Sequence, residues 1–383
     1  MRSGQFVKQS SGYTAFMPNN LPPEPPVDFS EALQLQLSQA DRAIGALNMV
    51  LSVLPNPDLL TGMFIQKEAL LSSQIEGTQS SLVDVLGAED DHAPTHDVGE
   101  VLNYVKAARH GLHRIKQDDM PLCFRIIKEM HGILMHSVRG GASTLTPGEF
   151  RTMQNWIGGS NLNNARFVPP PADALSALLG SLEHYMNQTG QLPPLVQCAL
   201  IHYQFETIHP FNDGNGRIGR LLITLFLLDQ KILDYPVLYL SAFLKIHQQE
   251  YYDRLQQVRQ SGQYEKWIAF FLEAVETVSN MVIDTTRRIQ QLERQDSDRL
   301  IEAGAGTDGI STLRYLMQQP IVFIQDVEKH LGKSRNTATK VINTAEALGI
   351  LKQISQGKRN RKYAYQAYVS ILSEGTEINP TLD

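Results

Sequence analysis

The segment from His209 to Arg220 combines residue types that bind phosphate and move protons. Gly214 and Gly216 flank Asn215 at the predicted start of a helix. Glycine lets successive backbone N–H groups point into one concavity, and the helix N-terminus adds a partial positive charge there. The pattern therefore predicts a cradle for a phosphate group.

Charged side chains around this cradle suit the same ligand. Arg217 and Arg220 are three residues apart, so both lie on nearly one helix face and can bind outer phosphates. Asp213 directly precedes the cradle, where a carboxylate can hold Mg²⁺ that bridges phosphates. His209 ends the preceding predicted helix, and an imidazole near its ordinary pKa of ~6.5 suits a general base. These convergent roles favour a catalytic site over a glycine-rich turn with solvated arginines.

Three glycines of the same segment, Gly214, Gly216 and Gly219, also fit the dinucleotide fingerprint G-x-G-x-x-G. That fingerprint needs a preceding β-strand, whereas residues 197–208 have a helical pattern. We therefore reject a dinucleotide site of that kind.

The composition narrows the class of protein. The chain has 383 residues, a formal charge of −6 and 42% hydrophobic residues, which is typical of two or three globular domains. Its two cysteines, Cys123 and Cys198, exclude a disulfide framework and a thiolate zinc cluster. The longest strongly apolar run, residues 221–228, is far shorter than the ~20 residues of a membrane helix, and no secretory signal is visible. We expect no membrane partner and a reducing, cytoplasmic compartment.

Hydrophobic periodicity predicts a mostly helical chain. A proline-rich arm over residues 1–28 precedes the first helix, and the polar and Gly-rich residues 294–309 predict a linker. Between residues 140 and 171, dense Gly, Asn and Pro around the run 165–168 predict a β-hairpin or flap. Helices are expected at about 30–54, 57–75, 98–116, 121–137, 172–188, 193–208, 215–230, 241–260 and 264–293.

The residues beyond the predicted linker resemble a winged helix. A short helix over 321–331, a turn, and a second helix capped by Ser334 precede two strands around the basic segment 357–362. Nine Lys and Arg against three Asp and Glu give residues 321–370 a local charge of +6. DNA contact is one interpretation, and a protein-contact or dimerisation unit with a basic rim is the other. The face that would contact DNA comprises Arg335, Asn336, Thr339, Lys340 and Asn343.

The glycine-rich segment resembles the Fic family signature H-x-F-x-[D/E]-G-N-G-R-x-x-R at every fixed position. Residues 148–170 are similar to the flap hairpin of that family, and residues 250–259 to its adenosine-contacting helix. The resemblance implies a mostly α fold, in which a Fic-fold helical core with a β-hairpin flap precedes a small α+β winged-helix domain. The implied domains are an N-terminal arm and helical region over 1–110, a catalytic core over 111–293, and the winged helix over 310–383.

The resemblance also implies a reaction and a role for each motif residue. AMP passes from ATP to a Ser, Thr or Tyr hydroxyl of a target protein or of the chain itself. Because Gly216 is kept, nucleotidyl transfer is favoured over phosphate transfer. His209 takes the hydroxyl proton, and Asp213 holds Mg²⁺ against the phosphates. The nucleotide is bound by Gly214, Asn215, Gly216, Arg217, Ile218, Gly219, Arg220 and Tyr252.

A second motif precedes the core. Ser72 and Glu76 are four residues apart, so they share one face at the end of a predicted helix, and Gly77 follows. Taken alone, the short pattern favours an exposed glutamate before a capping glycine over a functional motif. Beside a complete Fic motif it resembles the family's autoinhibitory helix, in which Glu76 pairs with Arg220 and the γ-phosphate is not seated productively.

Two other functions stay open at this stage. A DNA-binding regulator could use the Fic core as a nucleotide sensor, and a de-AMPylating or bifunctional enzyme could use Glu76 to position water. A homodimer is expected from the resemblance alone. Every residue assigned to the chemistry precedes residue 260, so the C-terminal unit is expected to be dispensable for catalysis.

Overall fold

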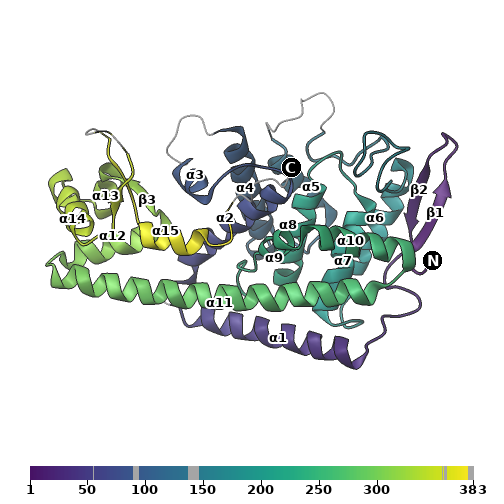
Figure 1. Ribbon diagram of the computed structural model, residues 1–383, viewed down its shortest axis with the longest axis horizontal. Coiled ribbons are helices and arrows are strands. Elements are labelled where there is room, and N and C mark those ends of the chain that lie inside the picture. Colours follow the sequence, from purple (N-terminus) through teal and green to yellow (C-terminus); the bar gives the residue numbers. More distant parts are fainter. Residues whose placement is uncertain (55, 89–94, 137–145, 356, 358–359, 378–383) are drawn as a thin grey trace.

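The computed structural model describes residues 1–54, 56–88, 95–136, 146–355, 357 and 360–377. Helices dominate this part of the chain, as predicted, together with two small antiparallel sheets (Figure 1). The strands are β1 (Gly4–Lys8), β2 (Thr14–Pro18), β3 (Ile321–Phe323), β4 (Lys352–Gln353) and β5 (Lys362–Ala364). The helices are α1 (Glu31–Ser52), α2 (Pro57–Ile75), α3 (Leu82–Gly87), α4 (His96–Lys116), α5 (Phe124–Leu134), η2 (Ala172–Ala174), α6 (Leu175–Met186), α7 (Pro194–Ile208), α8 (Asn215–Asp229), α9 (Ser241–Ile246), α10 (Gln248–Ser261), α11 (Tyr264–Glu302), α12 (Gly306–Gln318), α13 (Ile324–Leu331), α14 (Arg335–Ala347) and α15 (Gln366–Ser373).

Two central helices meet at the glycine-rich motif. α7 and α8 are buried on every face along nearly their whole length, as expected for helices inside a large core. α8 begins after Gly214, whose φ of 76° lies in the left-handed region that glycine adopts without strain. The turn between the two helices therefore presents the motif at the edge of the core.

The predicted inhibitory helix is part of the same core. α2 begins at Pro57 and ends at Ile75, in agreement with the sequence pattern, and it packs against α4, α8 and α9. All its residues from Met63 to Ser73 are buried. The C-terminal end of α2 lies against the N-terminal half of α8, where Ser72 and Glu76 contact Arg220.

The predicted extended arm over residues 1–28 is wrong in its first part. β1 and β2 form a hairpin, because Gly12 supplies a φ of 95° at the turn and the prolines begin only at Pro18. The backbone N–H of Phe16 on β2 donates to the carbonyl of Val168 at 3.0 Å. The hairpin thus packs against the flap segment and is hydrogen-bonded to it.

The predicted linker over residues 294–309 is also wrong. α11 continues through Glu302, and α12 starts at Gly306 after a turn that contains Gly304 with a φ of 72°. α1 runs along α11 (Figure 1), which buries one face of this long helix. The proposed domain boundaries fall inside α4, α11 and α12, so the division into three domains stays a prediction.

Two further predicted elements are shorter than expected. The helix expected at 241–260 is divided at His247 into α9 and α10. The flap hairpin is reduced to one antiparallel bridge between Ile157 and Phe167, and residues 137–145 lie outside the described part.

The C-terminal unit contains the two predicted helices, α13 and α14, followed by the two predicted strands, β4 and β5. The helix expected over 321–331 is wrong at its start, because residues 321–323 form β3, which pairs with β5, and α12 was not predicted. The sheet has the order β3-β5-β4. Ser334 caps α14, whose buried stripe is Ala338, Val341, Ile342 and Ala345. Lys358 and Arg359, predicted for the basic wing, lie outside the described residues. Within the described ranges, no helix is long and apolar enough to cross a lipid bilayer.

Candidate active site

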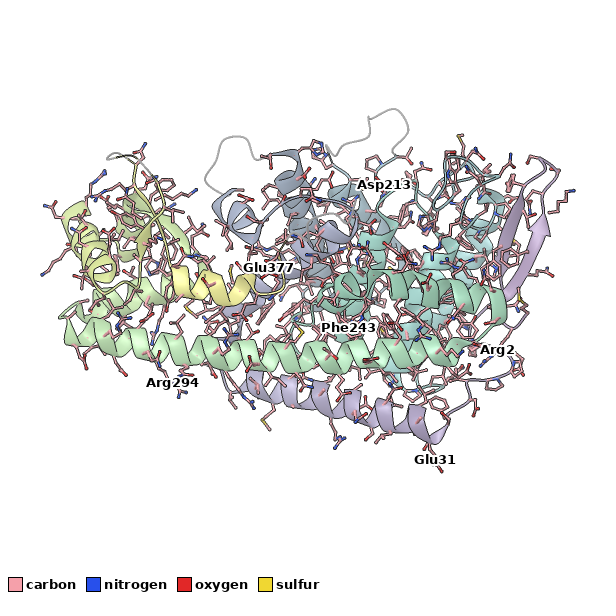
Figure 2. All side chains as sticks on the ribbon, viewed as in Figure 1. Arg2, Glu31, Asp213, Phe243, Arg294 and Glu377 are labelled. Atoms are coloured by element: carbon pink, nitrogen blue, oxygen red, sulfur yellow. The ribbon has the colours of Figure 1, made fainter. Side chains whose placement is uncertain are left out.

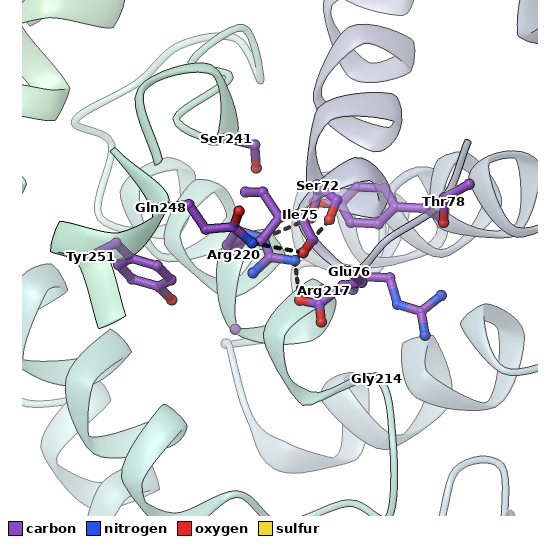
Figure 3. Close-up of polar contacts among 12 residues, drawn as sticks. Ser72, Ile75, Glu76, Thr78, Gly214, Arg217, Arg220, Ser241, Gln248 and Tyr251 are labelled. Carbon is purple, nitrogen blue, oxygen red and sulfur yellow. Dashed lines mark hydrogen bonds and ion pairs between the residues drawn. The ribbon is translucent and has the colours of Figure 1, made fainter. Parts of the chain in front are cut away.

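Arg220 on α8 is held by the end of α2 (Figure 3). Its Nε donates to Ser72 Oγ at 2.8 Å, and its Nη2 donates to the Ser72 carbonyl at 2.9 Å. The same Nη2 lies 2.6 Å from Glu76 Oε1. Burial opposes the charge of Arg220, but the Glu76 carboxylate raises its pKa above the ordinary value. The structure thus brings together residues of the two predicted motifs that are 144 positions apart.

The carboxylate of Glu76 also lies against the predicted phosphate cradle. A methyl group built on Gly216 would overlap the Glu76 carboxylate and the Arg220 guanidinium. An anionic group therefore already occupies the space beside the Gly216 backbone. Gly77 follows with a φ of 97°, which ends the helix directly after this contact.

His209 lies at the C-terminus of α7 in a left-handed conformation, with a φ of 50°. Its carbonyl accepts a hydrogen bond of 2.9 Å from Arg151 Nε. Burial lowers the pKa of His209 to about 3, so the expectation of an imidazole near its ordinary pKa is wrong for this structure. The ring is therefore neutral at pH 7, which is the form that a general base requires.

Side chains from three segments fix the motif loop. The Asn215 side chain accepts from the Phe211 N–H at 2.8 Å and donates to the Phe211 carbonyl at 2.8 Å. Phe211 is fully buried and stacks on His131 at 3.8 Å between ring centroids. His131 contacts the carbonyl of Asp213 at 3.0 Å through Nε2 and accepts from the Gly148 N–H through Nδ1 at 2.9 Å. Since the Asn215 side chain is engaged in the loop, its backbone N–H is the group available for a phosphate.

Asp213 and Arg217 flank the cradle. Asp213 Oδ1 accepts from the Gly214 N–H at 2.6 Å and lies 3.8 Å from Arg217 Nη2. Arg217 Nη1 donates to Glu100 Oε2 on α4 at 3.2 Å. Across the described ranges, no group of three His, Cys, Asp or Glu side chains is arranged to hold a metal ion. Mg²⁺ usually binds through one or two carboxylates together with phosphates, and the half-exposed Asp213 carboxylate fits that mode.

A cavity of about 330 Å³ opens beside these residues. His209, Gly216, Arg220 and Tyr252 line it among the residues predicted for catalysis and nucleotide binding. Ile218 is fully buried in the core, and a side chain on Gly219 would overlap Glu206, so both have packing roles in this structure. The remaining lining residues are Glu76, Ile157, Gly158, Arg166, Phe167, Glu206, Tyr251, Leu255, Gln256 and Arg259.

The flap forms one wall of this cavity. Ile157 and Phe167 exchange backbone hydrogen bonds of 2.8 and 3.1 Å. The Arg259 guanidinium lies 3.8 Å from the centroid of the Phe167 ring, and its Nε donates to Thr207 Oγ1 at 3.2 Å. The contact joins α10 to both the flap and α7.

Arg151 is a supporting residue that the sequence left without a role. Its guanidinium donates to the carbonyls of His209, Met153, Pro170 and Ile208 at 2.9, 3.1, 2.6 and 3.3 Å. The residue is 2% exposed. Its place in the flap-like run 148–151 was the one sequence feature that pointed to a role near the site. Its hydrogen-bond partners are backbone carbonyls, which no residue type identifies in a sequence.

Arg151→Met is expected to lower the free energy of unfolding by about 3 kcal/mol, because buried carbonyls lose their charged donor. It is also expected to reduce any activity that depends on His209, whose carbonyl it holds. Urea denaturation measures the first effect. Arg42→Met on the exposed face of α1 is the matched control and should change the midpoint little. Equal midpoints for the two variants would contradict the supporting role.

Comparison with known proteins relates this geometry to one family. Residues 34–113 match the N-terminal model of the Fic/DOC family, and residues 121–227 match the Fic/DOC family model itself. Protein adenylyltransferase Fic of Culex quinquefasciatus is 27% identical over 233 residues, which cover 58% of this chain and 42% of that protein. The Aedes aegypti protein of the same name is 28% identical over 202 residues, which cover 52% and 36%. The match thus spans less than half the length of these curated relatives.

Solved structures agree on the fold. The crystal structure of a Fic family protein from Desulfovibrio desulfuricans G20 has a TM-score of 0.57 and 22% identity, and the match covers 89% of this chain and 98% of that one. Residues 134–508 of Fic-1 from C. elegans give a TM-score of 0.51 at 19% identity, with 67% and 74% covered.

Proposed function

The chain belongs to the Fic/DOC family, and on this premise we propose that it transfers AMP from ATP to a hydroxyl group of a protein. The name protein adenylyltransferase, which the mosquito relatives carry, supports this reaction. The acceptor is a Ser, Thr or Tyr side chain of a target protein or of the chain itself.

One observation carries the proposal. A histidine whose pKa is lowered by burial, a glycine-rich helix N-terminus and a buried arginine line one cavity together with Tyr252 of α10. His209 and Gly216 line this cavity directly. Such a site can hold the phosphates at α8 and the adenosine at α10, which leaves the α-phosphate near the imidazole.

The proposed transfer follows from these positions. The acceptor hydroxyl attacks the α-phosphorus, and the bond from this phosphorus to the oxygen that bridges to the β-phosphate breaks. His209 receives the hydroxyl proton, and pyrophosphate leaves toward Arg217 and Arg220. Backbone N–H groups of Asn215 and Gly216 stabilise the negative charge that builds on the α-phosphate oxygens. Asp213 would hold Mg²⁺, which supplies charge neutralisation at the phosphates when bound.

We further propose that Glu76 inhibits this reaction. Its 2.6 Å pair with Arg220 engages the guanidinium that a γ-phosphate needs, and its carboxylate lies against Gly216. Both effects disfavour a tetraanionic ligand in its in-line position. The reverse reaction, with Glu76 positioning a water, stays a prediction, as do a homodimer and a cytoplasmic location.

ATP labelled at different phosphates tests the reaction type. Incubation of the Glu76→Gly variant with α-labelled ATP should place covalent label on protein, whereas γ-labelled ATP should not. Label from the γ-phosphate would instead indicate phosphate transfer. Label from neither, with ATP bound, would favour a nucleotide sensor.

DNA binding is a second candidate function, and the exposed face of α14 favours it. Arg335, Asn336, Lys340 and Asn343 are exposed there, opposite the buried stripe of the helix. α14 lies at the end of the molecule remote from the motif (Figure 1). A helix in this position can enter a DNA groove without contact with the nucleotide site.

DNA affinity is expected to fall steeply with salt, because basic side chains on this face act mainly on phosphates. Lys340→Ala should reduce the slope of log affinity against log salt by about 1. Fluorescence anisotropy with duplex DNA over a salt series measures the slope. Lys106→Ala, at an exposed position on α4, is the control with an unchanged slope. Salt-insensitive binding would contradict the role of the basic face.

A further inference from the structure

The last described segment of the chain, residues 374–377, lies against the inhibitory helix. Figure 2 labels Glu377, where the chain emerges from α15 into the middle of the molecule. Four side chains on three helices contact this segment, and we call them the docking strip. They are Lys67 and Gln74 on α2, Lys245 on α9 and Arg288 on α11.

The docking strip binds mainly the backbone of the segment. Lys67 Nζ donates to the Glu374 carbonyl at 2.7 Å, and Lys245 Nζ donates to the Glu377 carbonyl at 2.6 Å. Gln74 Nε2 donates to the Thr376 carbonyl at 3.0 Å. Three donors thus hold the carbonyls of residues 374, 376 and 377, in the turn that follows α15 and just beyond it. Contacts of this kind recognise a backbone conformation rather than one side chain.

Charge complements this geometry. Both guanidinium Nη atoms of Arg288 donate to the carboxylate of Glu374 at 2.6 Å, which is the bidentate arrangement. The strip carries three cations, and the segment carries Glu374 and Glu377. Thr376 between them is 4% exposed. The segment is therefore seated on the strip and is not merely adjacent to it.

Gln74 links the docked segment to the inhibitory turn. Besides the Thr376 carbonyl, its Nε2 donates to the Ser80 carbonyl at 3.0 Å, and its Oε1 accepts from Lys245 at 2.7 Å. Gln74 lies two residues before Glu76, and Ser80 lies four residues after it. The amide thus ties together the segment, the last turn of α2 and the loop that follows Glu76.

We propose that the docking strip is a peptide-binding site for the chain's own residues 374–377, and that its occupation holds Glu76 against Arg220. The proposal rests on the inhibitory role of Glu76 proposed above. Release of the segment removes the hydrogen bond from Gln74 to the Thr376 carbonyl and the one from Lys245 to the Glu377 carbonyl. The last turn of α2 and the loop that follows it then become less tightly held. The C-terminal unit thereby controls a nucleotide site that it does not touch.

Deletion of residues 374–383 tests this directly, because α15 ends at Ser373 and is left complete. The deletion should raise incorporation of α-labelled ATP by about 5-fold or more, the lower range of typical couplings between sites. In the Glu76→Gly background the deletion should add nothing, since both changes act through the same contact. Lys245→Ala should act in the same direction, and Lys266→Ala at an exposed position on α11 is its control.

A second readout separates the two proposals. Hydrogen exchange of the amides in residues 73–80 should accelerate in the deletion variant and in Lys245→Ala, with or without ATP. If Glu76→Gly raises labelling and the deletion does not, the docking proposal is overturned. If neither variant labels, the proposed function has failed, and the exchange rates decide the docking proposal. Unchanged protection of residues 73–80 then overturns it.

Discussion

His209→Ala is expected to abolish AMP transfer and to leave ATP binding nearly intact. The imidazole is the proposed acceptor of the hydroxyl proton, and loss of a general base typically reduces the rate by ~10²–10⁴-fold. ATP affinity should persist because the phosphate contacts come from α8 and not from His209. Label incorporation and ATP titration by calorimetry measure the two quantities on the same variant.

The burial of His209 calls for a control on folding in this experiment. His209 lies at the C-terminal end of α7 beside the cavity, and its carbonyl accepts from Arg151, so its replacement could disturb the turn. Thermal unfolding of His209→Ala should therefore be compared with that of the unchanged protein. A folded variant that binds ATP and still labels at the full rate would show that His209 is not the base.

Glu76→Gly is expected to give the largest gain, roughly 10-fold or more in AMP transfer. The pair with Arg220 has an N–O distance of 2.6 Å and a guanidinium side chain that is 1% exposed. Like charges about 4 Å apart repel by a few kcal/mol even at an effective dielectric of ~20, so a phosphate beside this carboxylate is strongly disfavoured. Glycine removes the charge at a position where the helix already ends.

Three comparisons identify the charge as the cause of this gain. Glu76→Gln keeps the shape and should also activate, although it can still accept a hydrogen bond from Arg220. Glu273→Gln removes an exposed carboxylate from α11 and should change nothing. Arg220→Ala should not mimic the gain, because it deletes the phosphate contact together with the inhibitory pair. Equal rates for Glu76→Gly and the unchanged protein would refute the inhibitory role.

The sequence was most informative where local pattern decides structure. The bounds of α2 follow from Pro57 at its start and from the Glu76-Gly77 end, and α8 follows from the glycine-rich start. The pairing of Glu76 with Arg220 joins residues 144 positions apart, so no spacing rule predicts it. The pairing was predicted only from the resemblance to the Fic family, and the structure shows it as a direct contact between the two side chains.

The prediction failed where distant contacts decide structure. Residues 294–302 are polar and were expected to be a linker, yet they extend α11 because Leu300 is buried and Asp296 accepts from Tyr365 at 2.8 Å. That partner is 69 residues away. The sequence could not predict the docking strip for the same reason. Its side chains donate mainly to backbone carbonyls of residues 374–377, and every residue has such a carbonyl. The sequence therefore contained no sign that the C-terminal unit, which was expected to be dispensable for catalysis, contacts α2, the helix that ends at Glu76.

Intact-mass measurement of Glu76→Gly after incubation with ATP and Mg²⁺ tests the central claim most directly. The same measurement on the double variant Glu76→Gly with His209→Ala supplies the background. We predict a mass increase of whole AMP units in the single variant and none in the double variant. No increase in the single variant, or an equal increase in both, would contradict an inhibited AMP transfer at this site.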